Sequence, residues 1–270
     1  MIILQKTKPT NLTSWPEVGG IHRHKDRAFF ESGKIIWRES MKYIDFEHFM
    51  SRKRLNRYLV ACYNDKKRAM TLYRYNLRLA QELLTIVSCF EVSLRNSIND
   101  ILIPLFGSEW LKDSVSKGGI FTDPLLHKTN RTITDALKKL QAQGKYSHSK
   151  LLAQMDFGMW KYMYSPRQYG LTRQSLLGVF PFKQRSTPQV HINQTYIFNE
   201  LDKINNLRNR IAHHEPLCFP TGCAVIDTSY IRREYQKILI LFQWMGIDAH
   251  SMLYGLDHVL KVCDKIDNLK

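Results

Sequence analysis

The sequence predicts an all-α protein, a helical bundle of about seven helices. Apolar residues recur at intervals of three and four over long stretches, which is the spacing of one buried helix face. No strand-like alternation of apolar and polar residues persists, and the chain shows no repeat of fixed period. With 270 residues, 44% of them hydrophobic and 24% charged, the chain has an ordinary globular composition and can bury a sizeable core.

The hydrophobic pattern divides the chain into an N-terminal arm, residues 1–45, and a helical domain, residues 46–270. The arm has no sustained period and contains prolines, glycines and the run HRHKDR, so we expect it to be flexible or loosely packed. In the domain, the clearest helix runs from about Lys67 to Leu105, and Pro104 and Gly107 predict its end. Other helices are expected over residues 45–63, 131–143, 149–165, 193–214, 228–246 and 249–270, with loops at 112–130 and 180–191.

The charge of the chain favours a polyanionic partner. Lys and Arg number 40 against 24 Asp and Glu, a formal net charge of +16. Such a balance suits nucleic acid or an anionic membrane surface. No apolar run is long enough to span a bilayer, and the first residues lack the pattern of a secretory signal, so we expect a cytoplasmic protein.

The five cysteines are scattered, which argues against a disulfide framework. A zinc site built from Cys218, Cys223 and a neighbouring histidine would lack a second pair of ligands at metal spacing, so buried free thiols are the favoured interpretation and no metal is expected.

The stretch RNRIAHHE, residues 208–215, concentrates polar residues at the end of a predicted helix. Asn209 and His213 are four residues apart, hence neighbours on one face, and the long side chain of Arg208 can lean toward them. Because Pro216 disfavours helical geometry before it, His213 should lie in the last turn, where the negative end of the helix dipole favours a protonated imidazole. A histidine that exchanges protons, an arginine that holds phosphate and an orienting asparagine suit phosphodiester cleavage.

A capped, polar helix end explains the same residues without any chemistry, and the spacing alone favours that interpretation. His214 falls beside the buried stripe, which indicates a structural role. Arg210 points away from the core.

Three blocks of the sequence resemble a known family. LRNRIAHHEPL, residues 207–217, is similar to the R-x4-6-H signature of HEPN ribonuclease domains, in the form with Asn directly after Arg. The stretch around FEVSLRN resembles the first conserved region of the Abi-like (abortive infection AbiF/AbiD) family, and LLAQMDFGMWKYMY resembles its middle block, with Met159 in place of the usual aromatic. The resemblance covers roughly residues 50–245, with all three blocks in order.

The resemblance implies an all-α domain with a HEPN-like core and metal-independent endoribonuclease activity in a bacterial anti-phage abortive-infection or toxin–antitoxin system. The ribose 2′-hydroxyl would attack the adjacent phosphorus and leave a 2′,3′-cyclic phosphate. By position, His213 would be the general acid or base, Arg208 would stabilise the transition state and Asn209 would orient one or both. Because the chain carries one good motif, a homodimer would complete the composite site. No cofactor is implied.

Glu91, Arg95 and Asn96, within FEVSLRN, are expected to support this site. Glu91 and Arg95 are spaced for a helix ion pair and would brace the motif helix or each other. Arg95 and Asn96 repeat the order of Arg208 and Asn209, but no histidine follows at the required distance. Direct contact with RNA is the alternative role.

Clusters of basic residues with tyrosines nearby are candidate contacts to an RNA backbone. They are Arg52, Lys53, Arg54, Arg57, Lys66, Lys67, Arg68 and Arg210. The resemblance also suggests a small noncoding RNA as a regulatory partner. Two other functions stay open: a non-catalytic RNA-binding protein, and a protein-interaction module whose long apolar helix, residues 67–105, contacts a partner.

Overall fold

The structure, a computed structural model, describes residues 30–31, 34–35 and 41–270. The chain separates into two units, residues 1–42 and residues 43–270. In the first unit, β1 (Phe30–Glu31) pairs antiparallel with β2 (Lys34–Ile35), with Phe30 opposite Ile35. The prediction of a flexible arm over residues 1–45 falls mostly outside the described residues.

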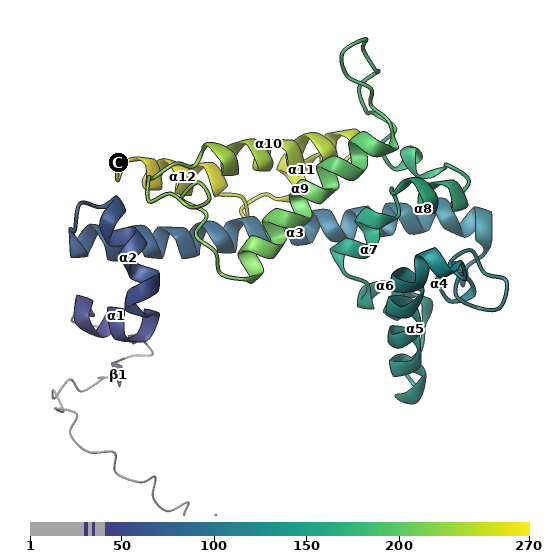
Figure 1. The fold of residues 1–270 in the computed structure, drawn as a ribbon, viewed down its shortest axis with the longest axis horizontal. Coiled ribbons are helices and arrows are strands. Elements are labelled where there is room, and N and C mark those ends of the chain that lie inside the picture. The colour runs from purple at the N-terminus through teal and green to yellow at the C-terminus, as the bar shows by residue number, and fades with distance from the viewer. Residues whose placement is uncertain (1–29, 32–33, 36–40) are drawn as a thin grey trace, which may run out of the picture. The chain divides into compact units, whose positions relative to one another are not determined.

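Residues 43–270 form an all-α unit, as the hydrophobic periods predict (Figure 1). The α-helices are α1 (Tyr43–Met50), α2 (Arg52–Ala61), α3 (Lys66–Phe106), α4 (Trp110–Asp113), α5 (His127–Ala142), α6 (His148–Gln154), α7 (Phe157–Tyr162), α8 (Pro166–Leu171), α9 (Gln194–Ala212), α10 (Ser229–Trp244), α11 (Ala249–Met252) and α12 (Val259–Asp267). Two 3-10 turns, η1 (Pro124–Leu126) and η2 (Leu176–Val179), lie between them.

Several predicted helices are divided in the structure, so this unit has twelve α-helices instead of about seven. The break between α1 and α2 falls at Ser51, whose positive φ of 68° ends one helix while its side chain caps the next. Likewise, α6 and α7 are separated at Asp156, the N-cap of α7. Its side-chain carboxylate accepts a hydrogen bond from the Met159 N–H at 2.9 Å. The prediction that Pro104 helps to end the long helix is wrong, because α3 continues to Phe106 and stops at Gly107 with a φ of 90°.

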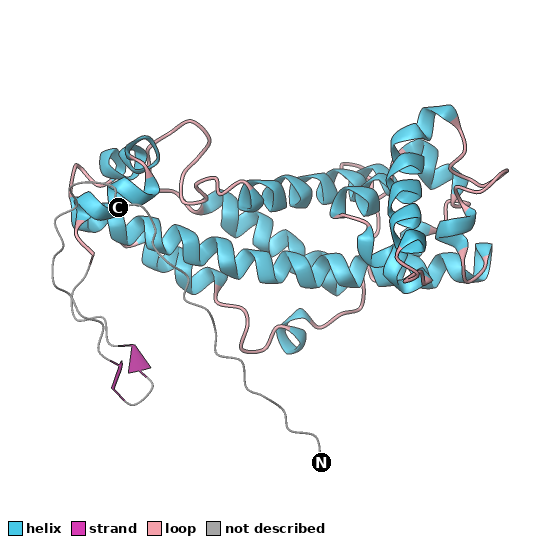
Figure 2. Ribbon diagram, turned by 90° about the horizontal axis from the view of Figure 1, so that it is seen from below, coloured by secondary structure: helices cyan, strands magenta, loops and turns pink. Residues whose placement is uncertain are grey.

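Helix α3, 41 residues long, is the central element on which most of the longer helices in residues 43–270 pack. Its apolar stripe is fully buried at Leu79, Leu83, Ile86, Phe90 and Leu94. Helices α2, α9, α10 and α12 contact α3 directly, and α7 packs on α9. Figures 1 and 2 show α1 and α2 at one end of α3 and the cluster of α4, α5 and α6 at the other. No helix among the described residues has the length and apolar character of a bilayer span.

Candidate active site at the end of α9

Helix α9 ends in two consecutive histidines with different backbone roles. His213 is the C-terminal cap, and its N–H donates to the Asn209 carbonyl at 2.9 Å. His214 follows with a left-handed φ of 55°, its N–H donates to the Ile211 carbonyl at 3.0 Å, and the Glu215 N–H donates to the Arg210 carbonyl at 2.9 Å. This pair of bonds is the Schellman closure, in which glycine usually occupies the left-handed position. The helix therefore ends at Ala212, and His214 is exposed instead of flanking the buried stripe.

The side chains of the motif lie on the open side of this helix end. Leu207 and Ile211 are buried, whereas Arg208 and Asn209 are half-buried and His213 is exposed. Within residues 41–270, no hydrogen bond engages the side chains of Arg208, Asn209 or His213. Their donors and acceptors are therefore available to a ligand, as phosphate binding and proton transfer would require.

Glu91 brings α3 into the same cluster. Burial raises the pKa of this half-buried carboxyl above its ordinary value, and the Arg208 guanidinium opposes that shift. The charge of Asp156, at the start of α7, raises the pKa of Glu91 further, while Arg95 lowers it. Charges from α3, α7 and α9 thus act on one another at the α9 motif.

Arg95 and Asn96 lie one helical turn beyond Glu91 on α3. The Arg95 Nε donates to the Asn96 Oδ1 at 3.3 Å, and Asn96 is exposed. The charges of Arg208 and Arg95 thus act on the pKa of Glu91. Among the described residues, however, Glu91 forms no ion pair with either arginine, so the ion pair expected between Glu91 and Arg95 is not formed, and Asn96 faces solvent.

Asn76, a residue that the sequence-based reasoning missed, fixes the chain that follows the motif. Its side-chain oxygen, buried on α3, accepts the N–H groups of Leu217 at 2.6 Å and Cys218 at 3.2 Å. The signal was present, because Asn76 is a polar residue inside the apolar stripe, between Leu72 and Leu79. Without it, two buried N–H groups would lose their acceptor.

Half of the cations predicted to contact RNA bind the protein's own carbonyls instead. Arg54 donates to the His214 carbonyl at 3.1 Å, and Arg57 donates to those of Pro220 at 2.6 Å and Cys223 at 2.7 Å. Arg68 donates to the Leu269 carbonyl at 2.8 Å, and Arg210 donates to the Pro216 carbonyl at 2.8 Å. Arg54, Arg57 and Arg210 therefore fix the segment that follows α9, whereas Arg68 ties the start of α3 to the end of the chain described.

The other four predicted cations, Arg52, Lys53, Lys66 and Lys67, are exposed. Lys66 stands over the Tyr43 ring, with its ammonium 5.4 Å from the centroid. Arg52, Lys53 and Lys67 make no ion pair with any described residue.

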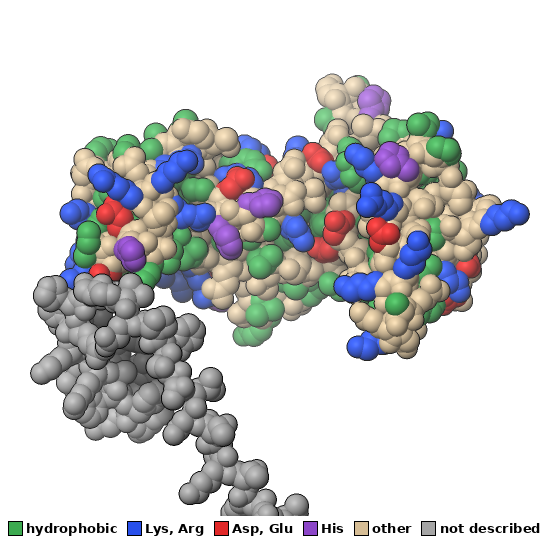
Figure 3. All heavy atoms as spheres, turned by 60° about the horizontal axis from the view of Figure 1, so that its bottom comes forward, with side chains coloured by type: hydrophobic (Ala, Val, Ile, Leu, Met, Phe, Trp, Pro, Cys, Tyr) green, Lys and Arg blue, Asp and Glu red, His purple; other side chains and the backbone are tan. Residues whose placement is uncertain are grey.

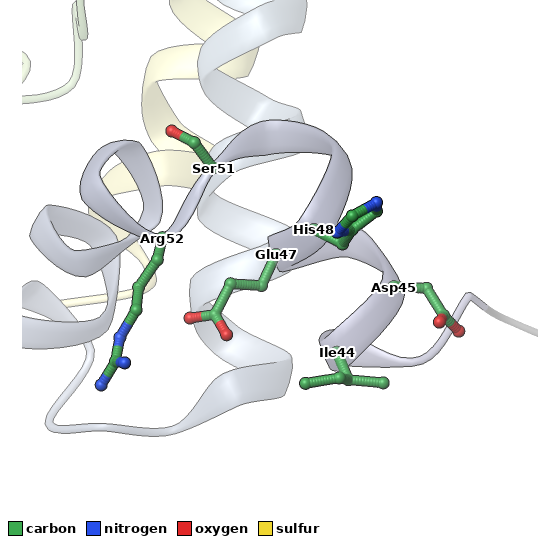
Figure 4. Close-up of a pocket in the computed structure, with 6 residues that line it drawn as sticks. All are labelled: Ile44, Asp45, Glu47, His48, Ser51 and Arg52. Carbon is green, nitrogen blue, oxygen red and sulfur yellow. The ribbon is translucent and has the colours of Figure 1, made fainter. Parts of the chain in front are cut away.

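An open hollow beside α1 does not form a second site. Figure 4 shows its polar side chains pointing in different directions. The residues that line it are Ile44, Asp45, Glu47, His48, Ser51 and Arg52. Among the described residues, no three His, Cys, Asp or Glu side chains are grouped to hold a metal ion. The Cys218 thiol is buried, which raises its pKa to about 12, whereas Cys223 is exposed.

The fold and this helix end define an all-α protein with an arginine, an asparagine and a histidine available at the C-terminus of one helix. Residues 39–218, two thirds of the chain and including the motif, match the family described as Abi-like protein. The chain therefore belongs to the Abi-like family, which confirms the resemblance to that family and connects the protein with abortive infection. Searches of curated proteins and of solved structures gave no match.

Proposed function

We propose that the protein is a metal-independent endoribonuclease of HEPN type, acting in the cytoplasm in a bacterial anti-phage abortive-infection or toxin–antitoxin system. The observation that carries the proposal is the end of α9. There, an exposed His213 follows Asn209 by one turn, and the positive charge of Arg208 lowers the pKa of the half-buried Glu91 against the effect of burial. All three motif side chains are free of hydrogen bonds to the described residues, and the chain belongs to the Abi-like family.

In this proposal the reacting groups are the RNA and the motif side chains of two copies of the chain. A general base removes the proton of a ribose 2′-hydroxyl, and that oxygen attacks the adjacent phosphorus. The bond from phosphorus to the 5′-oxygen of the next nucleotide breaks, and a general acid protonates the leaving oxygen. The products are a 2′,3′-cyclic phosphate and a 5′-hydroxyl. His213 serves as the base or the acid, and general acid–base catalysis of this kind contributes roughly 10²–10⁴-fold in rate.

Arg208 and Asn209 support that step in different ways. The Arg208 guanidinium stabilises the negative charge that develops on the phosphorane oxygens, where a bidentate donor is most effective. Asn209 orients the imidazole or the phosphate. Glu91, half-buried and within range of the Arg208 charge, helps to position the guanidinium before RNA binds.

A homodimer completes the site in this proposal, because in-line displacement places the attacking 2′-oxygen and the leaving 5′-oxygen on opposite sides of the phosphorus, and one imidazole does not reach both. An isologous contact brings two identical α9 ends together. Sedimentation analysis should give twice the chain mass of 31.8 kDa. Specific activity should fall when the protein is diluted below the dissociation constant of the dimer. Activity that stays proportional to concentration in a monomeric protein would contradict this part.

The experiment is cleavage of labelled single-stranded RNA and transfer RNA in excess EDTA, with the product ends mapped. Wild-type protein should leave cyclic-phosphate ends, and His213→Ala should leave none. His214→Ala is the matched control, because it removes the neighbouring imidazole and should retain cleavage. Equal cleavage by wild type and His213→Ala would overturn the proposal.

The second candidate is a non-catalytic RNA-binding protein that works with a small noncoding RNA. The Schellman closure favours it, since it shows that this helix end is a complete structural element without any ligand. Salt-sensitive RNA binding without cleavage by wild type would select this candidate. The third function, a protein-interaction module, was based on a long apolar helix free to contact a partner. The apolar stripe of that helix, α3, is buried within residues 43–270 and is therefore not free to do so.

A further inference from the structure

The hairpin formed by α5 and α6, residues 127–154, is the basic surface that the sequence-based reasoning passed over. It carries six exposed cations: Lys128, Arg131, Lys138, Lys139, Lys145 and Lys150. Its one carboxylate, Asp135, pairs with Arg131 at 3.5 Å. The five lysines make no ion pair or side-chain hydrogen bond with any residue that the structure describes.

The cations on α5 share one face. At about 100° per residue, Lys128, Arg131, Lys138 and Lys139 fall within an arc of about 100°. The buried residues Ile133 and Leu140 lie on the opposite side. From Lys128 to Lys139 this face extends about 16 Å along the helix axis. Asp135 falls on the same face and pairs with Arg131, so the unpaired cations of this face are Lys128, Lys138 and Lys139. Cations that follow one helix face in this way can contact successive phosphates of a backbone.

The hairpin turns back on itself at Gly144, which extends the basic surface onto α6. Gly144 adopts a φ of 62°, and the Lys145 N–H donates to the Leu140 carbonyl at 3.0 Å. Helix α5 projects away from α3 in Figure 1, and Figure 3 shows Lys and Arg side chains spread over that part of the unit. The surface is therefore sterically open to a large partner.

An RNA backbone fits this surface better than a lipid bilayer does. Helices that lie on membranes place large apolar side chains opposite or beside their cations. Between residues 127 and 154 no large hydrophobic side chain is exposed. Binding to RNA needs no such residues, because cations that neutralise phosphates release condensed counterions.

Along the chain, the hairpin is followed immediately by a residue that acts on the candidate active site. Helix α6 ends at Gln154, two residues before Asp156, which caps α7 and acts on the pKa of Glu91. We propose that this basic hairpin binds the phosphate backbone of the RNA that is cleaved at the end of α9. In naming the cleaved RNA as its ligand, the inference rests on the proposed function.

The test is the binding of a fluorescent single-stranded RNA over a series of salt concentrations. Every protein carries His213→Ala, so that the RNA stays intact. The hairpin variant is Lys138→Gln/Lys139→Gln/Lys145→Gln/Lys150→Gln. The matched control, Lys117→Gln/Arg185→Gln/Lys261→Gln/Lys265→Gln, removes the same charge from exposed residues that are neither in the hairpin nor among the predicted RNA contacts. Both sets are exposed, so unchanged thermal midpoints should show that the variants fold.

The hairpin variant should bind at least tenfold more weakly near 0.1 M salt, and its plot of log affinity against log salt should lose about 0.7 in slope per phosphate contact removed. The control should lose far less in both. Equal losses in the two variants, or a larger loss in the control, would overturn the proposal. So would a hairpin variant that keeps its RNA affinity while losing affinity for phosphatidylserine vesicles. If the hairpin variant alone loses RNA affinity but wild-type protein never cleaves RNA, the binding surface stands and the proposed ribonuclease falls.

Discussion

Two basic regions of the molecule, α2 and the α5–α6 hairpin, use their positive charge in different ways. The α2 arginines Arg54 and Arg57 donate to main-chain carbonyls of the segment that follows α9. The hairpin lysines, among them Lys138 and Lys139, have no such partner among the described residues. Net charge predicts that a polyanion binds but does not predict where it binds. An arginine whose donors already bond main-chain carbonyls has fewer donors left for a phosphate. Substitutions in α2 should therefore change stability, and those in the hairpin should change binding.

The largest change in stability is expected for Asn76 on α3, which bonds the same segment after α9 that the α2 arginines bond. Asn76→Ala removes the buried acceptor of the Leu217 and Cys218 N–H groups and should lower the free energy of unfolding by about 3 kcal/mol. Urea denaturation measures this change. Asn206→Ala is the control, since its side chain bonds Asp202 at the exposed surface and should cost less than about 0.5 kcal/mol. A cost below about 1 kcal/mol for Asn76→Ala would show that other contacts fix this segment.

The difference between α2 and the α5–α6 hairpin can be tested by removing one positive charge from each and comparing the loss of stability. Arg57→Ala leaves two carbonyls without their donor and should cost about 1–2 kcal/mol of stability. Lys139→Ala should change stability by less than about 0.5 kcal/mol, because its side chain is exposed and unpaired within residues 41–270. Chemical denaturation of both variants checks the pair. Similar stability losses in both would remove the distinction on which the comparison depends.

The ends of α5 and α9 offer a second comparison, because both helices close in the same way. Gly144 occupies the left-handed position after α5, and His214 occupies it after α9. His214→Gly should therefore stabilise the protein by about 1 kcal/mol, whereas Gly144→Ala should destabilise it by a similar amount. Thermal unfolding distinguishes the two directions. Destabilisation by His214→Gly would mean that the imidazole makes a contact that outweighs its backbone strain.

The smallest expected effect is the pH dependence due to Glu91. Because its folded-state pKa lies above the ordinary value of 4.5, the folded protein holds this proton more tightly than the unfolded chain does. Its contribution to stability is then fully present below pH 4.5 and is lost as the pH rises through the raised pKa. Glu91→Gln should be more stable than wild type near neutral pH, with the gain vanishing in acid. A gain that is independent of pH would contradict the assignment.

The sequence predicts the long-range organisation of the fold better than its local breaks. The apolar stripe of α3 and the motif helix α9 were both visible, because burial of one face leaves a period that persists over many residues. The breaks at Ser51 and Asp156 were not visible, since the apolar pattern continues across a cap. In the candidate site, the spacing predicts that Asn209 and His213 lie one turn apart at the end of a helix, and α9 does end there. The bond from Arg54 to His214 was not, because 160 residues separate the two in sequence.

The central claim is that the end of α9 performs chemistry, separately from the surface that binds RNA. The direct measurement is the single-turnover cleavage rate at saturating protein, together with the RNA dissociation constant, for wild type and His213→Ala. The account predicts a loss of at least about 100-fold in cleavage rate, with little change in the dissociation constant. Unchanged cleavage, or a cleavage loss matched by an equal loss of RNA binding, would contradict it.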